Sequence, residues 1–546
     1  MFVSRKSDWG RTRSRGVLAL SLSLALAGCS GDDDDDKDKD KDKNCVAGQA
    51  VTLSGKVTYD FVPAIYTPTT RTGTLDFARA TVKPVRSGVV QVREGSTVLT
   101  NGTTNEQGQY QLTFTPTCNG TLTLLAVAKS TSPDIQIEDN TDGDAVWALG
   151  DSITSTTTTK DLHAGHGWNG SNYTANRRTA APFAILDSMY TAARAFIAVR
   201  PAATFPALKV NWSPANVPQG GNKAAGLIGT SHFSFTENEI YILGQEGADT
   251  DEFDSHVIVH EWGHYFEANL ARSDSPGGPH SAGDELDPRL AFGEGYGNAL
   301  AAMLLPETMY VDTLWTRSGL TAFGFDAETA PTTPSDDPKP GPFSESTVMR
   351  FLYDVFDSGS NESGYDNVAA GLGPVYDVLV GPQKSTEALT TIGSFIVGLK
   401  AQPGVNETAV NALAAHYSVG PVTSAFGDGD TKLRGMYNVV PNGYPYSTSV
   451  TFTGGPSTFN KQQQNRYYVF TGTGRAMNIS AANASEDVGI EVYQTGEVVG
   501  SADKFTAGTE TINLTSTQGD TTYVLAVMGF KDNAGSYPVS ISITSP

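Results

Sequence analysis

Beyond its first thirty residues this chain lacks long hydrophobic runs, and it is poor in positive charge. A membrane-spanning helix needs about 20 successive apolar residues, so the sequence excludes a body that crosses a bilayer by helices. Lys and Arg number 37 against 59 Asp and Glu, a net charge of −22. Such a surface repels polyanions, so nucleic-acid binding is excluded as well. Hydrophobic residues still make up 39% of the chain, which excludes a wholly disordered protein.

The N-terminal segment has the pattern of an export signal. Five Lys and Arg residues between positions 5 and 15 precede an apolar run of 11 residues, Val17–Ala27. The run ends in Leu-Ala-Gly-Cys at positions 26–29, which resembles the lipobox of bacterial lipoproteins. That resemblance implies removal of residues 1–28 and a lipid anchor on Cys29, at the outer membrane or the cell surface, with a periplasm-facing orientation as the alternative. An ordinary secretory signal with a chance cysteine is the competing interpretation.

Residues 29–45 form a charged stretch of Asp and Lys with nothing to bury. We expect it to be a solvated linker between the lipid and the folded domains. Cysteine is scarce, and Cys29, Cys45 and Cys118 are the three in the sequence. If Cys29 carries the lipid, the other two form an even pair in an oxidising compartment. The sequence therefore predicts a disulfide between Cys45 and Cys118.

The 546 residues exceed what one hydrophobic core usually organises, so we expect several folded units. Residues 46–150 contain short β-branched runs separated by Gly, Pro and Asn, a pattern typical of an antiparallel β-sandwich. The stretch Thr-Asn-Glu-Gln-Gly-Gln-Tyr-Gln-Leu at 104–112 resembles carboxypeptidase-regulatory-like domains. Asp139–Asp144 has the carboxylate density of a Ca²⁺ loop, but it lacks the Glu that an EF-hand places twelfth, and a solvated turn is the alternative.

Helical periodicity dominates residues 151–435, although short strands are expected at 208–212, 227–235 and 239–243. Strands followed by helices predict an α+β domain with a mostly helical C-terminal lobe. Residues 440–546 return to strand patterns and resemble bacterial pre-peptidase C-terminal domains through Tyr-Val-Leu-Ala-Val-Met-Gly-Phe at 523–530. The predicted fold class is therefore multidomain, with an α+β domain flanked by two all-β sandwiches.

The motif His-Glu-Trp-Gly-His at 260–264 is the strongest chemical signal in the chain. With 8 His in the sequence, about 0.005 chance matches to this pattern are expected. A helix over 253–271 puts His260 and His264 one turn apart on one face, where both imidazoles can bind zinc. Glu261 lies about 100° round the helix, near the metal without displacing a ligand. It is the predicted general base. Two core histidines with a chance Glu are the competing interpretation.

A catalytic zinc needs a third protein ligand. The metzincin pattern fails, because Glu267 and Leu270 stand where that pattern has Gly and His. Glu294 follows His264 by 30 residues on a second apolar stretch, 288–305, that is interrupted by glycines. Here the sequence resembles gluzincin zinc metallopeptidases, whose α+β zincin fold supplies a Glu ligand from a second helix. The resemblance implies that Glu294 is the third zinc ligand; a surface carboxylate is the alternative.

Several residues are candidates for supporting roles. Many gluzincins carry an Asp four residues after the third ligand to orient the first His, whereas this chain has Asn298. Asp284 and Asp287, between the two predicted helices, are alternative partners for that imidazole. The oxyanion candidates are Tyr353, His280, Arg350 and Tyr376. The resemblance also implies that the strand at 239–243 is the edge strand that pairs with extended substrate, and an ordinary sheet strand is the alternative, compatible interpretation.

The sequence thus predicts a zinc metalloendopeptidase, a hydrolase that cleaves polypeptide substrates outside the cytoplasm. Its cofactor is Zn²⁺, its only membrane contact is the lipid anchor, and a monomer is expected. A catalytically silent surface binding or adhesion protein built on a metallopeptidase-like domain is the alternative from another class. A zinc hydrolase of non-peptide amides is the third. Intact Glu261 argues against the silent protein, because a purely structural zinc site does not need a general base.

Overall fold

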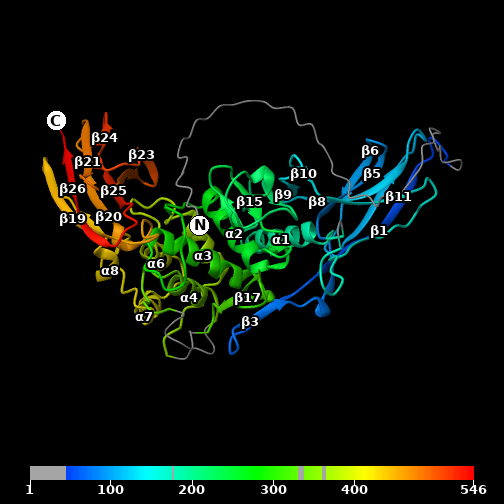
Figure 1. Cartoon of the computed structure of the whole chain (residues 1–546), viewed down its shortest axis with the longest axis horizontal. Helices are drawn as coiled ribbons and strands as arrows, with labels where there is room; N and C mark the ends of the chain where they lie inside the picture. Colours follow the sequence, from blue (N-terminus) through cyan, green and yellow to red (C-terminus); the bar gives the residue numbers. More distant parts are fainter. Residues whose placement is uncertain (1–44, 175–176, 330–336, 359–363, 546) are drawn as a thin grey trace. The chain divides into compact units, whose positions relative to one another are not determined.

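The computed structural model describes residues 45–174, 177–329, 337–358 and 364–545. The predicted signal peptide, Cys29 and the linker up to residue 44 lie outside these residues. The described residues form two compact units: those from 45 to 265 together with 309–325 make the first, and those from 266 to 308 together with those from 326 to 545 make the second. Figure 1 shows their helices and strands, coloured along the sequence. Within the described ranges, no helix combines the length and the apolar composition that a membrane span requires.

The first unit is built mainly from strands. Its elements are β1 (Val51–Phe61), β2 (Ala64–Thr67), β3 (Thr72–Leu75), η1 (Phe77–Arg79), β4 (Thr81–Pro84), β5 (Gly88–Glu94), β6 (Thr97–Thr103), β7 (Gln109–Phe114), β8 (Leu122–Thr131), β9 (Asp134–Asp139), β10 (Ala145–Val146), β11 (Ala148–Ile153), β12 (Leu162–Ala164), α1 (Ala181–Val199), β13 (Leu208–Trp212), η2 (Lys223–Ala225), β14 (His232–Ser234), β15 (Glu239–Ile242), η3 (Asp251–Phe253), the start of α2 (Ser255–Asn269), β16 (Met309–Thr316) and β17 (Gly319–Asp326). In β7 buried and exposed side chains alternate, which is the strand period that the sequence shows.

One sheet of the first unit extends across the predicted domain boundary at residue 150. Its strand order is β14-β15-β13-β9-β8-β5-β6, with β10 and β11 added at β9 and β8. The crossing point is the parallel pairing of Leu208–Asn211 with Ile135–Glu138. Helix α1 packs against β8 and β9 of this sheet. The strands of the predicted sandwich and those that precede the His-Glu-Trp-Gly-His motif therefore share one hydrogen-bonded layer.

The acidic stretch Asp139–Asp144 is the turn that joins β9 to β10. The backbone N–H of Asp144 donates to the carbonyl of Asp139 at 3.0 Å. One oxygen of the Asp139 carboxylate accepts hydrogen bonds from the backbone N–H and the hydroxyl of Thr141. These contacts are those of a tight Asx turn.

The predicted disulfide between Cys45 and Cys118 is confirmed, with a Cα–Cα distance of 5.7 Å. It closes a loop with a sequence separation of 73 residues. The bond ties the start of the described chain to the segment between β7 and β8.

Replacing both Cys45 and Cys118 by Ser should destabilise the first unit by about 4 kcal/mol, because the open chain regains loop-closure entropy in the unfolded state. Chemical denaturation followed by Trp fluorescence measures this loss. Cys29→Ser serves as the control and should unfold like the wild type. Equal unfolding midpoints for the double variant and the control would contradict the prediction.

The second unit joins a helical part to a β-part. Its helices are the end of α2, α3 (Pro288–Leu304), α4 (Glu345–Phe356), α5 (Leu372–Val380), α6 (Ile392–Lys400), α7 (Glu407–His416) and α8 (Thr431–Arg434). Helix α3 begins where the sequence predicts, with Asp287 as N-cap and Pro288 in the first turn. A Cβ at Gly295 would lie 2.5 Å from the Cβ of Val348, so this glycine allows α3 and α4 to pack closely.

The C-terminal part of the second unit is the β-rich segment that the sequence predicts. Its elements are β18 (Tyr437–Val439), β19 (Tyr446–Gly454), η4 (Gln462–Gln464), β20 (Asn465–Thr471), β21 (Met477–Asn483), β22 (Val488–Gln494), β23 (Glu497–Ala502), β24 (Gly508–Leu514), β25 (Thr522–Gly529) and β26 (Gly535–Thr544). They form two sheets, ordered β18-β20-β25-β22-β23 and β19-β26-β21-β24. Buried residues of both sheets, among them Phe452, Ile490 and Leu525, form one hydrophobic core, as in a sandwich.

Candidate functional site

Helix α2 carries the whole motif 260–264 and holds its two histidines side by side. The preceding residues Val257, Ile258 and Val259 are buried, so this turn of the helix is fixed in the core. The Nε2 atoms of His260 and His264 are 3.1 Å apart. In a tetrahedral zinc site, ligand nitrogens at about 2.0–2.1 Å from the metal are separated by about 3.3 Å. The two imidazoles therefore fit a zinc ion almost without rearrangement.

Glu261 lies buried beside the histidine pair and contacts the sheet. Its Oε2 accepts a hydrogen bond of 2.7 Å from the backbone N–H of Phe233 in β14. A buried carboxylate held by a single described donor keeps acceptor positions for a proton. Glu261 can therefore act as a base without breaking a salt bridge.

The prediction that the strand at 239–243 is the sheet edge is wrong. β15 pairs in parallel with β13 on one side and antiparallel with β14 on the other. The edge is β14, which has no further neighbouring strand within the described part of the chain. The strand predicted at 227–235 has three residues in the structure. A strand this short has too little sequence pattern to be identified as the sheet edge. The Phe233 contact with Glu261 was missed for the same reason.

Two aromatic side chains border the histidines in the first unit. Phe235 is 52% exposed, and its ring centroid is 6.4 Å from that of His264. The ring of Tyr310, in β16, is 6.3 Å from that of His260. Burial and the carboxylates of Asp312 and Glu261 raise the pKa of Tyr310 well above its usual value, so its hydroxyl stays neutral. The sequence analysis missed β16 and β17, although Met309–Phe325 combines β-branched and aromatic residues around a Gly turn.

Glu294 lies on α3 in the second unit, where it contacts His280. Oε2 of Glu294 is 3.3 Å from Nε2 of His280, and Oε2 of Glu345 is 2.7 Å from Nδ1 of the same ring. Burial opposes the charged imidazole, but the two carboxylates outweigh it and raise the pKa of His280 to about 10. His280 is thus a cationic donor beside a predicted ligand. The role of Glu294 at a metal stays a prediction.

Asp284 and Asp287, the two carboxylates predicted as alternative partners of the His260 imidazole, have other contacts. Asp287 caps α3 and accepts hydrogen bonds from Arg289 and from the Tyr467 hydroxyl, within a fully buried ion pair. Asp284 is 3.0 Å from Nζ of Lys461. These contacts hold the start of α3 and its preceding loop to the β-rich part of the second unit. Asn298 is buried on α3, and its orienting role stays a prediction.

The other oxyanion candidates differ in how free they are to act. Arg350 forms a buried ion pair with Asp337 at 2.9 Å. Tyr353 packs against Phe356 on α4, and burial with nearby carboxylates raises its pKa to about 12. Tyr376 contacts the ring of Phe266. His280, the fourth candidate, contacts Glu294.

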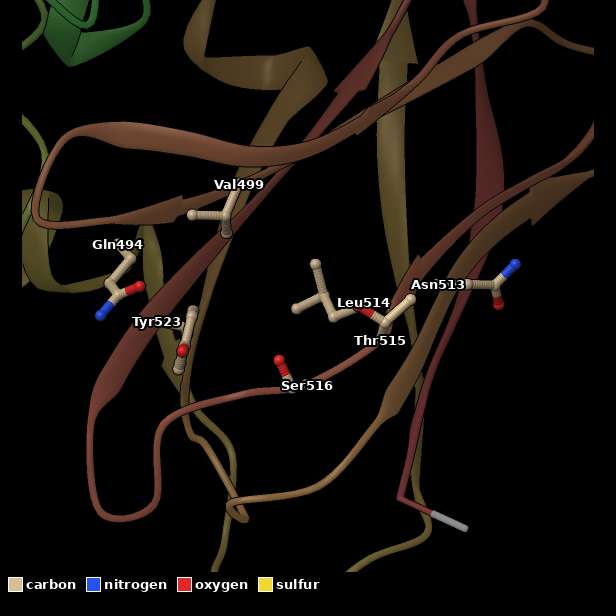
Figure 2. A pocket seen from close by; sticks show the side chains of 7 residues that line it. All are labelled: Gln494, Val499, Asn513, Leu514, Thr515, Ser516 and Tyr523. Carbon is tan, nitrogen blue, oxygen red and sulfur yellow. The ribbon is translucent and has the colours of Figure 1, made fainter.

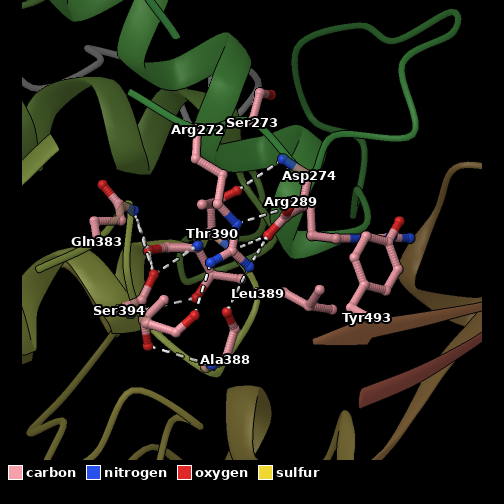
Figure 3. Close-up of polar contacts among 12 residues, drawn as sticks. Arg272, Ser273, Asp274, Arg289, Gln383, Ala388, Leu389, Thr390, Ser394 and Tyr493 are labelled. Carbon is pink, nitrogen blue, oxygen red and sulfur yellow. Dashed lines mark hydrogen bonds and ion pairs between the residues drawn. The ribbon is translucent and has the colours of Figure 1, made fainter. Parts of the chain in front are cut away.

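The loop that follows α2 is fastened within the second unit by a polar network (Figure 3). Arg272 donates to the carbonyls of Thr386 and Ala388 and pairs with Asp274 at 2.6 Å. Asp274 in turn accepts from the backbone N–H of Thr390 at 2.8 Å. Charged groups buried with matched partners fix a loop in one arrangement. This network therefore holds the chain at the end of α2, ahead of His280.

A pocket in the β-rich part of the second unit offers no comparable chemistry (Figure 2). It is lined by side chains from β22 to β25, namely Gln494, Val499, Asn513, Leu514, Thr515, Ser516 and Tyr523. None of these is a His, Cys, Asp or Glu. The paired His side chains and the Glu beside them lie on α2 instead.

Comparison with known proteins identifies no family. No family model matches the chain, and no curated protein matches it. Among solved structures, the pre-peptidase C-terminal domain of a collagenase from Bacillus anthracis is similar over 20% of this chain and 94% of its own, with 13% identity and a TM-score of 0.16. The insecticidal crystal protein Cry2Aa is similar over 23% of this chain and 24% of its own, with 12% identity and a TM-score of 0.14.

Proposed function

We propose that this chain is a lipid-anchored zinc metalloendopeptidase that hydrolyses extracellular or periplasmic polypeptides. One observation carries the proposal: the Nε2 atoms of His260 and His264 are 3.1 Å apart on a buried helix, with Glu261 buried beside them. Two imidazoles at this spacing suit zinc, and a carboxylate next to them suits a general base. A purely structural zinc site does not need a carboxylate beside its ligands.

Glu294 is the proposed third ligand, and the end of α2 supports it. Helix α2 continues past His264 into the second unit, where Phe266 contacts Tyr296 of α3 with ring centroids 6.3 Å apart. A Cβ built at Gly293 would lie 3.5 Å from Oε2 of Glu267. Gly293 and Tyr296 flank Glu294 in α3. The residues of α2 that follow directly after His264 therefore pack beside Glu294 within the second unit.

Each of these groups has its own proposed role in peptide hydrolysis. Zinc, when bound, supplies a Lewis acid for the scissile carbonyl and makes water more acidic. Glu261 takes the proton of the attacking water and passes it to the leaving amine nitrogen. His280 is the proposed donor to the developing oxyanion: its Nδ1–H would stay on Glu345, and its Nε2–H would turn from Glu294, 3.3 Å away, to the oxyanion.

The edge strand β14 is the proposed binding surface for extended polypeptide. Its outer side carries no neighbouring strand among the described residues, and its residue Phe233 contacts Glu261. A peptide added there as a further strand would gain main-chain hydrogen bonds that do not depend on its sequence. The exposed ring of Phe235 provides an apolar contact for one of its side chains.

Zinc analysis combined with digestion of a diverse peptide library tests the proposal. We expect one zinc per chain and cleavage at internal peptide bonds. Bound zinc without any cleavage would favour the silent binding protein, and cleavage confined to small non-peptide amides would favour the third class. Absence of bound zinc would overturn the proposal.

The anchor is tested at Cys29, which lies outside the described residues. Cys29→Ala should move the protein from the membrane to the soluble fraction, because the lipid is its proposed attachment. Ser30→Ala changes the neighbouring residue and should leave the protein on membranes. Fractionation with immunoblotting measures both. Membrane retention of Cys29→Ala would show that the lipobox interpretation fails.

A further inference from the structure

A second cluster of candidate metal ligands lies in the first unit, apart from the histidine pair. Carboxylate oxygens of Asp249, Asp251 and Asp312 all lie within 4.8 Å of one another. Asp249 precedes η3 and Asp251 is its first residue, whereas Asp312 belongs to β16, 61 residues further along the chain from Asp251. The cluster therefore joins a loop to a strand.

A fourth carboxylate, Asp254, adds an independent observation. It is completely buried, and its Oδ2 accepts hydrogen bonds from the backbone N–H and the hydroxyl of Thr313. Its Oδ1 is also buried and has no hydrogen-bond partner among the described residues. Asp312, next to Thr313, is the charged group with the largest effect on Asp254. The Oδ1 atom of Asp254 is thus a buried acceptor beside the cluster, and no described residue donates a hydrogen bond to it.

Further oxygens in the same place also lack donors within the described ranges. Asp251 is 3% exposed. Its Oδ2 accepts a hydrogen bond from the Ser231 hydroxyl, while its buried Oδ1 has no hydrogen-bond partner among the described residues. The hydroxyl oxygen of the completely buried Thr250 likewise has no hydrogen-bond partner among the described residues. Unsatisfied buried oxygens are costly, and several in one place call for a cation or for protons.

Burial and mutual repulsion act together on these carboxylates. Arg178, the nearby guanidinium, is paired with Glu252. Burial, followed by repulsion from neighbouring carboxylates, raises the pKa of Asp251, Asp254 and Asp312 above their usual range. Carboxylates in such surroundings either take up protons or bind a divalent ion.

We propose that Asp249, Asp251, Asp254 and Asp312 form a Ca²⁺ site that ties β16 to the start of the helix that carries His260. All the offered atoms are oxygens, which hard cations prefer over imidazole-binding metals. Mg²⁺ usually keeps several waters and binds through one or two carboxylates, whereas Ca²⁺ accepts six to eight oxygen ligands, so four carboxylates in one place suit Ca²⁺ better.

The site would hold two elements that border the histidines. Asp254 directly precedes α2, and its carbonyl accepts from the backbone N–H of Ile258 in the first turn. Tyr310 lies two residues before Asp312 and contacts the rings of His256 and His260 at 5.5 and 6.3 Å. An ion bound by both segments stabilises the first unit by mass action, whether or not the chain has peptidase activity.

Calcium titration of the zinc-loaded, calcium-free protein tests this proposal. We expect calorimetry to find one Ca²⁺ per chain, and saturating Ca²⁺ to raise the unfolding temperature by about 2–4 °C. Asp312→Asn, with Asp249→Asn as a second variant, should lose both effects. Asp142→Asn, in the exposed β9–β10 turn, is the matched control and should keep both.

The contrary results are distinct. A wild type that neither binds nor responds to Ca²⁺, together with an Asp312→Asn variant more stable than the wild type, would mean that protons neutralise the cluster, and would overturn the proposal. Loss of the calcium effect in Asp142→Asn alone would place the Ca²⁺ site in the β9–β10 turn. That result would also overturn the proposal.

Discussion

Glu261→Gln should lower peptide cleavage by about 10²–10⁴-fold while leaving one zinc bound per chain. The amide is nearly isosteric with the carboxylate, but it cannot take the proton of the attacking water, and loss of a general base typically has an effect of this size. The amide oxygen can still accept from the backbone N–H of Phe233, so the contact between α2 and β14 survives. Single-turnover cleavage of a peptide identified from the library, with zinc measured on the same sample, gives both quantities.

Glu407→Gln is the matched control for this change. Its side chain is 68% exposed at the start of α7, so the same chemical substitution should leave cleavage and zinc unaltered. If Glu261→Gln lost its zinc, the residue would be acting as a ligand and the assignment of roles would fail. If it retained full activity, another group would have to be the base.

Glu294→Ala should lose most of its zinc and, with it, peptidase activity. Two imidazoles alone hold the ion much more weakly than two imidazoles and a carboxylate, and the methyl side chain offers no replacement donor. Equilibrium dialysis against a zinc buffer measures the change in affinity. Added zinc in excess should restore part of the activity, since Glu261 and both histidines remain.

Glu345→Ala provides a close control for Glu294→Ala. Both carboxylates accept from His280, so either substitution removes one of its two described partners. Only Glu294 is proposed to bind the metal, so Glu345→Ala should keep its zinc. Equal zinc loss in the two variants would assign the effect to His280 or to the loop around it. Retention of zinc and activity by Glu294→Ala would remove it from the ligand set.

Local chain patterns predicted the helices of the candidate site closely. The helix expected at 253–271 is α2 at Ser255–Asn269, and the one expected at 288–305 is α3 at Pro288–Leu304. Both have strong local signals: an uninterrupted apolar run before the motif in α2, and an Asp-Pro start in α3. The i, i+4 spacing of His260 and His264 then fixes their common face, because a helix has 3.6 residues per turn.

Features that depend on contacts between distant segments were not predictable from the sequence. Which strand forms the sheet edge depends on pairing, and β14 is too short to show a period. The pairing of β9 with β13 joins segments about 70 residues apart, and no local pattern encodes it. The acidic cluster is similar: Asp249, Asp251 and Asp254 read as a polar loop until Asp312 is brought beside them.

The pairing of β9 with β13 also bears on how this protein can change over evolutionary time. A recombination event that replaced residues 46–150 with an unrelated domain would delete the neighbour of β13 and expose a row of main-chain N–H and C=O groups in the middle of a sheet. Such an edge promotes aggregation, so most exchanges of this kind would be lost by selection. Residues 46–150 and the segment with the two histidines are therefore expected to be inherited together, while the residues between them vary more freely.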